Sequence, residues 1–318
     1  MRVLVTGVGG FVGPPTVAAL LAAGHEVHGT VRRPPAPIRR AALGPEVVLH
    51  TVDLIDGAAT ARVVAAVAPD AVVHLAGFSS PAAAENDVAE AYRGNLGTML
   101  AVLGAVRAHA PRARLLAVTS GHVYGLLDPP GAPVGEDAPL RPLSVYDATK
   151  AAADLAAAQW GRAYGLDVVR ARPFNHTGPG QEAAFVCSAI ARQIAFAEAG
   201  GARAVRVGNV DAVRDFLDVR DVAAAYVALL AHGRTGEAYN VCRGEGTSVS
   251  EVIAVLRTHA RIPVPIRSDP ALRRPQDVPR FVGDPAKIAR DTGWRATTPL
   301  EDTLGALLDD WRARGAGA

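Results

Sequence analysis

Short apolar runs alternate along the first half of the chain with longer stretches in which apolar residues recur at helical spacing. The runs are rich in valine and leucine and have the length of buried strands. They cover residues 2–6, 25–31, 46–52, 71–75, 114–119 and 167–171. The helical stretches between them cover 16–23, 57–67, 86–109 and 147–164. Strands that alternate with helices predict an α/β fold, with a doubly wound parallel sheet covered on both faces.

The alternation loosens after residue 172, where Gly, Pro and Arg become more frequent. Further helices are predicted at 183–199, 221–232 and 248–260, and one more strand of the large sheet at 239–241. We therefore expect two parts. Residues 1–172, with 210–244 returning to them, form the larger domain, and 173–209 with 245–318 form a smaller, mostly C-terminal lobe. The lobe is expected over the carboxyl ends of the strands, where such sheets bind ligands.

Composition excludes several classes of function. With 33 basic and 31 acidic residues the formal charge is +2, too small to indicate a nucleic-acid or acidic-membrane partner. Two distant cysteines, Cys187 and Cys242, predict neither a disulfide framework nor a zinc site. The chain enters a strand at once without a signal peptide, and no apolar run is long enough to span a bilayer. We expect a soluble cytoplasmic protein without a structural metal.

A glycine-rich turn, T-G-V-G-G-F-V-G, follows the first strand and opens the first helix. Glycine lets the backbone approach a pyrophosphate, and a helix N-terminus offers free N–H groups to it. The turn therefore predicts a Rossmann-type dinucleotide site, although an ordinary tight turn has a similar composition. The residues expected to contact the cofactor here are Gly7, Gly10, Phe11, Val12 and Gly13.

The end of the second strand favours NADP(H) over NAD(H). An NAD site usually has an acidic residue there for the ribose 2′-hydroxyl, whereas arginine suits a 2′-phosphate. Here Arg32 and Arg33 follow the strand and no acid is near. Since the chain uses arginine widely, a solvated basic loop is the alternative, and NAD(H) stays possible.

The ends of the third and fourth strands offer supporting candidates. Asp53, followed by Leu54, either caps the next helix or binds the adenine. Leu75, Ala76 and Gly77 are small enough for close approach of a cofactor. A purely structural role stays open for both segments.

Tyr146 and Lys150 have the i, i+4 spacing that places them on one face of a helix. A free tyrosine has a pKa of about 10, and a nearby ammonium or an oxidised nicotinamide favours the phenolate and lowers that pKa. Lys150 is one of two lysines among 33 basic residues, and its compact head can also hold ribose hydroxyls. With Ser120 after the fifth strand, the pattern predicts a proton-transfer site.

These motifs together resemble the extended short-chain dehydrogenases/reductases, in the nucleotide-sugar epimerase/dehydratase group. The resemblance covers nearly the whole chain. It implies that Ser120, Tyr146 and Lys150 are catalytic and that Asn95 matches the family's helix asparagine. It also implies a homodimer paired through 86–109 and 147–164, whose small side chains permit close packing.

Four further segments carry a narrower similarity: A-R-P-F-N-H-T-G-P-G-Q, V-R-D-F-L-D-V-R-D, Y-N-V-C-R-G and R-R-P-Q-D-V-P. They resemble the GDP-4-dehydro-6-deoxy-D-mannose reductases and the related dehydratases. It implies that Pro173 and Phe174 border the nicotinamide. The residues implied to bind the nucleotide sugar are Ser120, His122, Asn175, Val186, Arg192, Arg214, Arg274 and Asp277. Two converging arginines suit a diphosphate, although each also suits a surface ion pair.

His122 favours reduction over dehydration. In the dehydratases that this sequence resembles, a carboxylate lies two positions after the Ser/Thr, and these enzymes need it to eliminate water. Reduction of a keto group needs only hydride from the nicotinamide and a proton from Tyr146. We therefore expect an NADP(H)-dependent 4-keto reductase acting on a GDP-4-keto-6-deoxyhexose. The alternatives are a 4-epimerase with tightly bound NAD, a GDP-mannose 4,6-dehydratase, since histidine can carry protons, and an NADP(H)-sensing protein without turnover.

Overall fold

The computed structural model describes residues 1–35, 37–127, 131–201, 204–272 and 278–315. Its largest sheet has seven strands in the order β11-β6-β5-β4-β1-β2-β3, and every pairing is parallel. These strands are β1 (Arg2–Thr6), β2 (Glu26–Val31), β3 (Val48–Thr51), β4 (Ala71–His74), β5 (Arg114–Val118), β6 (Val168–Pro173) and β11 (Ala238–Val241). The doubly wound α/β fold expected from the sequence is confirmed.

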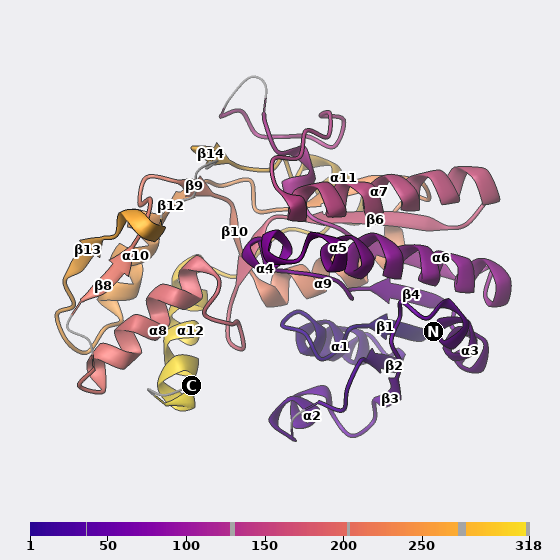
Figure 1. Ribbon diagram of the computed structural model, residues 1–318, viewed down its shortest axis with the longest axis horizontal. Helices are drawn as coiled ribbons and strands as arrows, with labels where there is room; N and C mark the ends of the chain where they lie inside the picture. Colours follow the sequence, from indigo (N-terminus) through magenta and orange to yellow (C-terminus); the bar gives the residue numbers. More distant parts are fainter. Residues whose placement is uncertain (36, 128–130, 202–203, 273–277, 316–318) are drawn as a thin grey trace.

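Alternation along the strands divides the core between the two faces of this sheet. On β1, Val3 and Val5 join one apolar cluster, whereas Leu4 joins another. The first cluster includes residues of α1 (Gly13–Ala22), α9 (Val219–His232) and α11 (Ala286–Thr292). The second includes residues of α3 (Gly57–Val67), α6 (Thr98–His109) and α7 (Val145–Tyr164). Helices therefore cover both faces, and all the strands end at one edge (Figure 1).

The helix expected over 86–109 is wrong in detail. Three separate elements replace it: α5 (Val88–Tyr92), the π-helical turn η1 (Arg93–Gly97) and α6. Before them lies α4 (Pro81–Asn86), which the apolar pattern did not predict. Asp87 separates α4 from α5, because its side chain accepts a hydrogen bond from the Glu90 N–H and starts a new helix.

The smaller lobe lies to the left in Figure 1 and has its own core. Apolar residues of α8 (Val186–Glu198), α10 (Val249–Thr258) and α12 (Leu300–Arg314) make up much of that core. Short strands complete the lobe and join it to the sheet: β7 (Asn175–Thr177), β8 (Val205–Val207), β9 (Val213–Arg214), β10 (Phe216–Asp218), β12 (Thr247–Ser248), β13 (Ile266–Ser268) and β14 (Arg280–Phe281). The remaining elements are α2 (Pro37–Leu43) and the 3-10 turns η2 (Gly121–Tyr124) and η3 (Pro270–Leu272).

Chain segments cross between the two parts more than once. After the lobe helix α8, α9 and β11 return to the large sheet. Later, Ile288 of α11 and Trp294 also pack into the core of the large sheet, within a range expected to belong to the lobe. Across the segments that the structure describes, no helix is both long and apolar enough to cross a membrane.

Candidate active site

The glycine turn between β1 and α1 is built by close backbone contacts. Gly7 has a φ of +70°, and a Cβ on it would lie 2.9 Å from the Ala76 Cα. A Cβ on Gly13 would lie only 2.0 Å from the Val8 carbonyl oxygen. Both positions therefore require glycine. Gly10 is exposed, and its N–H donates to the Gly7 carbonyl oxygen at 3.1 Å, which tightens the turn.

The N-terminus of α1 leaves backbone donors for a ligand. No side chain caps this helix, whose N-cap residue is Val12. Pro14 and Pro15 have no N–H, and the Gly13 N–H already donates to Gly10. The N–H groups of Phe11 and Val12 donate to none of the residues that the structure describes. This pair of free amides at a positive helix end fits a pyrophosphate.

At the ends of β2 and β3, the candidate side chains for the adenosine half of a dinucleotide are exposed. Arg32 and Arg33 directly follow β2 and are exposed. The alternative in which Asp53 caps the next helix is wrong: Asp56 is the N-cap of α3 and accepts from the Ala59 N–H at 3.0 Å. Asp53 is exposed and accepts a local hydrogen bond, from the Ile55 N–H at 3.1 Å. Its neighbour Leu54 is buried.

Asn95, in the π-helical turn, joins the end of β4 to α7. It is 2% exposed. Its amide oxygen accepts from the Phe78 N–H at 2.9 Å, and its amide nitrogen donates to the Thr149 Oγ1 at 2.8 Å. A Cβ on Gly77 would lie 2.4 Å from that amide oxygen. Asn95 thus shapes the turn that follows Leu75 and Ala76, both of which are half-buried.

Ser120 lies beside Tyr146, and Lys150 follows Tyr146 by one turn of α7. A capping box between Ser144 and Asp147 starts α7, so Tyr146 and Lys150 lie one turn apart on it. All three side chains are nearly buried, at 4%, 9% and 7% exposure in that order. Ser120, the N-cap residue of η2, lies beside Tyr146 and lowers the pKa of its hydroxyl.

The expected lowering of the Tyr146 pKa is wrong for the protein alone. Burial raises the pKa of Tyr146 to about 12, while the hydrogen bond to Ser120 opposes the rise and the Asp147 charge adds to it. Burial also lowers the pKa of Lys150 to about 8. Loss of water therefore outweighs any benefit from the ammonium, and Tyr146 stays protonated across neutral pH.

His122 lies beside Tyr146, and α7 brings a carboxylate, that of Asp147, close to it. Its Nδ1 is 3.7 Å from the Asp147 Oδ1. Its ring meets the Tyr146 ring edge-on with centroids 6.3 Å apart, and it stacks on Phe281 at 5.3 Å. Phe281 in turn stacks on Phe174 at 5.0 Å. A lobe strand, β14, thus contacts the η2 turn.

On the substrate side, Pro173 and Phe174 are buried at the end of β6. The next residue, Asn175, has a buried Oδ1 without a hydrogen-bond partner among the described residues. An orphaned buried acceptor is costly unless a ligand donor reaches it, so Asn175 fits a ligand contact.

Sequence reasoning missed two residues that join the lobe to this site. His176, directly after Asn175, stacks on Phe11 of the glycine turn with centroids 6.0 Å apart and ring planes 4° apart. Its place inside P-F-N-H-T was a signal that could have found it. Phe281 comes from a strand far along the chain, and no local pattern predicts its stacking on His122.

The other predicted substrate residues are more scattered. Arg214 is half-buried and donates to the Val213 carbonyl oxygen at 2.8 Å. Val186 begins α8, and the exposed Arg192 lies over the Trp311 ring at 5.8 Å. Arg274 and Asp277 lie outside the described residues. Among the described residues, no group of three His, Cys, Asp or Glu side chains is placed to hold a metal.

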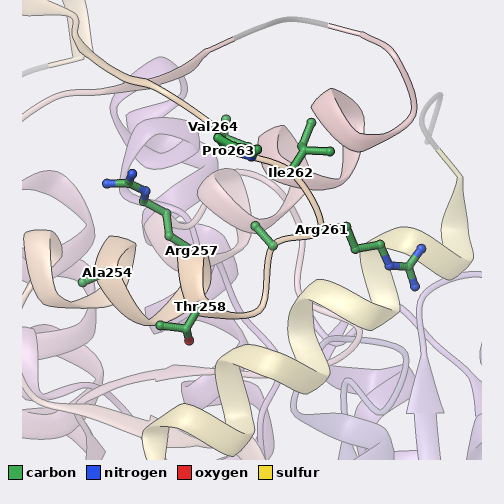
Figure 2. Close-up of a pocket in the computed structure, with 8 residues that line it drawn as sticks. Ala254, Arg257, Thr258, Arg261, Ile262, Pro263 and Val264 are labelled. Carbon is green, nitrogen blue, oxygen red and sulfur yellow. The ribbon is translucent and has the colours of Figure 1, made fainter.

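A separate hollow of about 480 Å³ lies at the end of α10 (Figure 2). Residues between 254 and 264 line it, including Arg257 and Arg261. None of the site residues predicted from the sequence lies there, so this hollow is not part of the candidate active site.

Comparison with known proteins assigns the family. Residues 4–306 match the family described as GDP-mannose 4,6 dehydratase. The chain belongs to this family. The expected membership in the extended short-chain dehydrogenases/reductases is thereby confirmed. Within this group, the GDP-6-deoxy-D-mannose reductase of Pseudomonas aeruginosa is 37% identical over 314 residues, which are 98% of either chain.

Solved structures of the group agree along the whole chain. The structure of RMD from Pseudomonas aeruginosa complexed with NADPH has a TM-score of 0.86 and 36% identity, and the match covers 99% of this chain and 100% of that one. The UDP-glucose 4-epimerase of Thermus thermophilus in complex with NAD has a TM-score of 0.87 and 30% identity, over 98% and 99% of the two chains.

Proposed function

We propose that the protein is an NADP(H)-dependent oxidoreductase that reduces the 4-keto group of a GDP-4-keto-6-deoxyhexose. Its product is a GDP-6-deoxyhexose of the GDP-rhamnose type. The observation that carries the proposal is the buried Tyr146, beside Ser120 and one turn before Lys150. It occurs in a chain similar over 98% of its length to a GDP-6-deoxy-D-mannose reductase.

In the proposed reaction the three catalytic side chains have different tasks. Bound NADPH supplies the hydride for C4. Ser120 donates a hydrogen bond to the carbonyl oxygen and holds it beside Tyr146. Tyr146, protonated across neutral pH, donates its proton as negative charge develops on that oxygen. Lys150 stabilises the phenolate that remains and holds the ribose hydroxyls.

The cofactor site is proposed to extend from the glycine turn to the strand ends. The free amides of Phe11 and Val12 bind the pyrophosphate, and Arg32 with Arg33 binds the 2′-phosphate. The adenine lies by Asp53 and Leu54. The nicotinamide half lies between the segment Leu75–Gly77, which Asn95 supports, and Pro173 with Phe174.

The lobe is proposed to bind the nucleotide sugar. Asn175, with its orphaned acceptor, reaches the sugar diphosphate. The further contacts that we propose are His122, Val186, Arg192, Arg214, Arg274 and Asp277.

Of the two domains, the cofactor domain is proposed to be 1–172 with 210–244, and the lobe 173–209 with 245–318. The packing of Ile288 and Trp294 supports moving the segment 286–294 to the cofactor domain.

A 4-epimerase with tightly bound NAD is the second candidate, favoured by the similarity to the Thermus epimerase solved with NAD. Mass spectrometry of the nucleotides bound to the purified protein separates the two: tightly held NAD indicates the epimerase, and exchangeable NADPH the reductase. The decisive assay is NADPH oxidation with GDP-4-keto-6-deoxymannose. Absence of any turnover, with NADPH bound, would instead favour a sensing protein.

We also propose that the protein is cytoplasmic and a homodimer. The proposed interface is the outer face of α6 and α7, which pack against each other. Leu100 on α6 and Leu155 and Tyr164 on α7 are 39%, 56% and 44% exposed. Exposed apolar side chains among small residues on two adjacent helices suit pairing with a second copy across a two-fold axis.

A further inference from the structure

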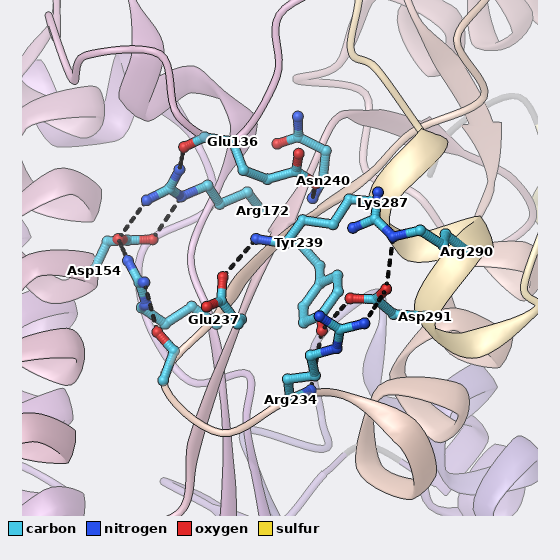
Figure 3. Close-up of polar contacts among 12 residues, drawn as sticks. Glu136, Asp154, Arg172, Arg234, Glu237, Tyr239, Asn240, Lys287, Arg290 and Asp291 are labelled. Atoms are coloured by element: carbon cyan, nitrogen blue, oxygen red, sulfur yellow. Dashed lines mark hydrogen bonds and ion pairs between the residues drawn. The ribbon is translucent and has the colours of Figure 1, made fainter.

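A buried carboxylate, Asp154, lies directly behind the catalytic residues. It is on α7, one turn after Lys150 and two turns after Tyr146, and it is 0% exposed. Its Oδ2 accepts from the Thr119 Oγ1 at 3.0 Å and from the Arg172 Nε at 2.9 Å. Its Oδ1 accepts from the Arg172 Nη2 at 2.8 Å (Figure 3). One carboxylate therefore joins α7 to β5 and β6.

Two partners of Asp154 are next to residues of the proposed site. Thr119 directly precedes Ser120, and Arg172 directly precedes Pro173 and Phe174. The planar, two-point contact between Arg172 and Asp154 fixes both distance and orientation. The spacing between the Ser120 and Tyr146 side chains thus depends on Asp154, because this carboxylate ties the strand end before Ser120 to the helix that carries Tyr146.

A tyrosine extends the same contacts to the turn that carries His122. Tyr124 is the last residue of η2 and is 0% exposed. Its hydroxyl accepts from the Arg172 Nη1 at 2.9 Å and donates to the Asn240 Oδ1 at 2.7 Å. The Asn240 amide in turn donates to the Val134 carbonyl oxygen at 2.8 Å. Val134 pairs with Val282, next to Phe281 of the lobe.

Stability alone is a poor reason for such a cluster. Burial alone would raise the pKa of Asp154, but hydrogen bonds and charge from Arg172 and from Arg170 outweigh it. They hold the pKa of Asp154 below its usual value, so the carboxylate is ionised. A buried ion pair often stabilises a fold no better than well-packed apolar residues would, because both charges lose their water. What it does provide is a unique geometry.

We propose that the Asp154 cluster, defined as Thr119, Tyr124, Asp154 and Arg172, positions the catalytic residues. Its members touch neither substrate nor cofactor in this proposal; they act through Ser120, Tyr146 and the η2 turn. The effect on turnover rests on the proposed function, whereas the effect on the Tyr146 side chain does not.

The chain offers a matched control on the same sheet. Tyr239 is also 0% exposed, and its hydroxyl also accepts one hydrogen bond, from the Arg234 N–H at 3.0 Å. It donates one as well, to the Asp291 Oδ2 at 3.0 Å. These contacts join β11 to α11 and to the loop after α9, and none of them involves an element that carries Ser120, Tyr146 or Lys150 (Figure 3).

The test compares Tyr124→Phe with Tyr239→Phe in the full-length protein. Each change removes one buried hydroxyl with one donated and one accepted bond, so both should lower Tm similarly, by about 2–4 °C. Only Tyr124→Phe should lower kcat, by about tenfold, because misplacement of the reacting groups slows the chemical step. KM and the Kd for NADPH should change less than about twofold, because binding is not affected. Thr119→Val, which removes a single bond to Asp154, should lower kcat in the same direction.

A second readout needs no substrate. The Tyr146 phenol is titrated with NADP⁺ bound. The signal is the difference in ultraviolet absorbance between each protein and the same protein with the additional change Tyr146→Phe. Ser120 lowers the pKa of Tyr146, so displacement of the Ser120 side chain from Tyr146 should raise that pKa. We expect Tyr146 to titrate at higher pH in Tyr124→Phe and at the wild-type pH in Tyr239→Phe. Equal effects of the two variants on kcat and on this titration would overturn the proposal. If the wild type reduces no GDP-4-keto-6-deoxyhexose, the proposed function fails, and the titration still decides the role of the cluster.

Discussion

Tyr146 is the residue on which the proposed chemistry depends most directly. Replacing it by Phe removes the proton donor and keeps the ring. We expect kcat for NADPH oxidation to fall by about 10²-fold, the usual scale for a general acid. NADPH binding, followed by fluorescence, should change less than about twofold, because the hydroxyl is needed for the proton rather than for cofactor affinity. A variant that keeps most of its turnover would show that another group supplies the proton.

His122 tests whether the site reduces or dehydrates. Reduction at C4 needs one proton, whereas elimination across C5–C6 needs a second acid–base group. We expect the wild type to leave GDP-mannose unchanged, and His122→Ala to lower kcat far less than Tyr146→Phe does. The reason is that His122 packs on Phe281 and pairs with Asp147, as a residue that shapes the pocket. Water elimination from GDP-mannose, or a defect as deep as that of Tyr146→Phe, would make His122 a catalytic residue.

Arg32 and Arg33 carry the proposed preference for NADPH. Both are exposed at the end of β2, where a 2′-phosphate would add negative charge. The double change Arg32→Ala with Arg33→Ala should raise KM for NADPH by about tenfold or more and leave KM for NADH nearly unchanged, since a charge-assisted bond to phosphate is lost only with NADPH. Steady-state kinetics with both cofactors gives the answer. An equal rise for both would contradict the preference.

Asp215 makes stability depend on pH. It is 0% exposed and accepts from the N–H groups of Arg243, Gly244 and Gly283. Burial raises its pKa from 3.8 to about 6, although these bonds oppose the rise. Because the folded protein holds this proton more tightly than the unfolded chain, the stabilisation is present at low pH. It is lost as the pH rises from 3.8 through 6.

The measurement compares urea unfolding of the wild type with that of Asp215→Asn. The difference in unfolding free energy, wild type minus variant, should fall by about 2 kcal/mol between about pH 4.5 and about pH 7.5, because the variant has no proton to lose. The variant should be less stable at every pH, since an amide cannot accept all the backbone bonds. A difference independent of pH would mean that Asp215 titrates normally.

At the scale of elements, the end of α3 offers a stabilising change. Of the described residues, only Ala68 combines a side chain with a positive φ, at 45°. It ends α3 in the left-handed conformation, and its N–H donates to the Val64 carbonyl oxygen. Ala68→Gly should raise the unfolding free energy by about 0.5–1 kcal/mol, because glycine adopts this conformation without strain.

Ala65→Gly is the matched control, since Ala65 is exposed in the last turn of the same helix, where the backbone is still helical. There glycine should lower the unfolding free energy by about 1 kcal/mol. Denaturant unfolding of both variants therefore should give opposite signs. The same sign for both would mean that the end of α3 relaxes out of the left-handed conformation in solution.

At the scale of the whole molecule, the outer face of α6 and α7 tests the proposed dimer. Sedimentation velocity should show a dimer at micromolar concentration. Leu155→Arg should give a monomer, because Leu155 is 56% exposed at the centre of that face and a buried unpaired charge is costly. Ile262→Arg, at an exposed apolar residue of the lobe, should stay dimeric. A monomeric wild type would refute the dimer.

Local sequence determined the strands, the glycine turn and the pairing of Tyr146 with Lys150. Buried parallel strands are continuous apolar runs, so seven of them can be recognised without a structure. Gly7 and Gly13 are fixed by close backbone contacts within one βα unit and its neighbour. Tyr146 and Lys150 share a face because helical spacing alone brings i and i+4 together. Apart from the contact of Gly7 with Ala76, each of these features depends on residues close together in the chain.

Only the tertiary structure decided the features that join distant segments. Asp154 of α7 meets Thr119 and Arg172, which lie at the ends of β5 and β6. His122 meets Asp147 of α7 and Phe281 of the lobe strand β14, because the fold brings these separate elements together. The pKa of Tyr146 was predicted in the wrong direction for the same reason: the motif shows the ammonium nearby but not the loss of water around the phenol. Burial and long-range pairing depend on the whole packed chain, so no local pattern specifies them.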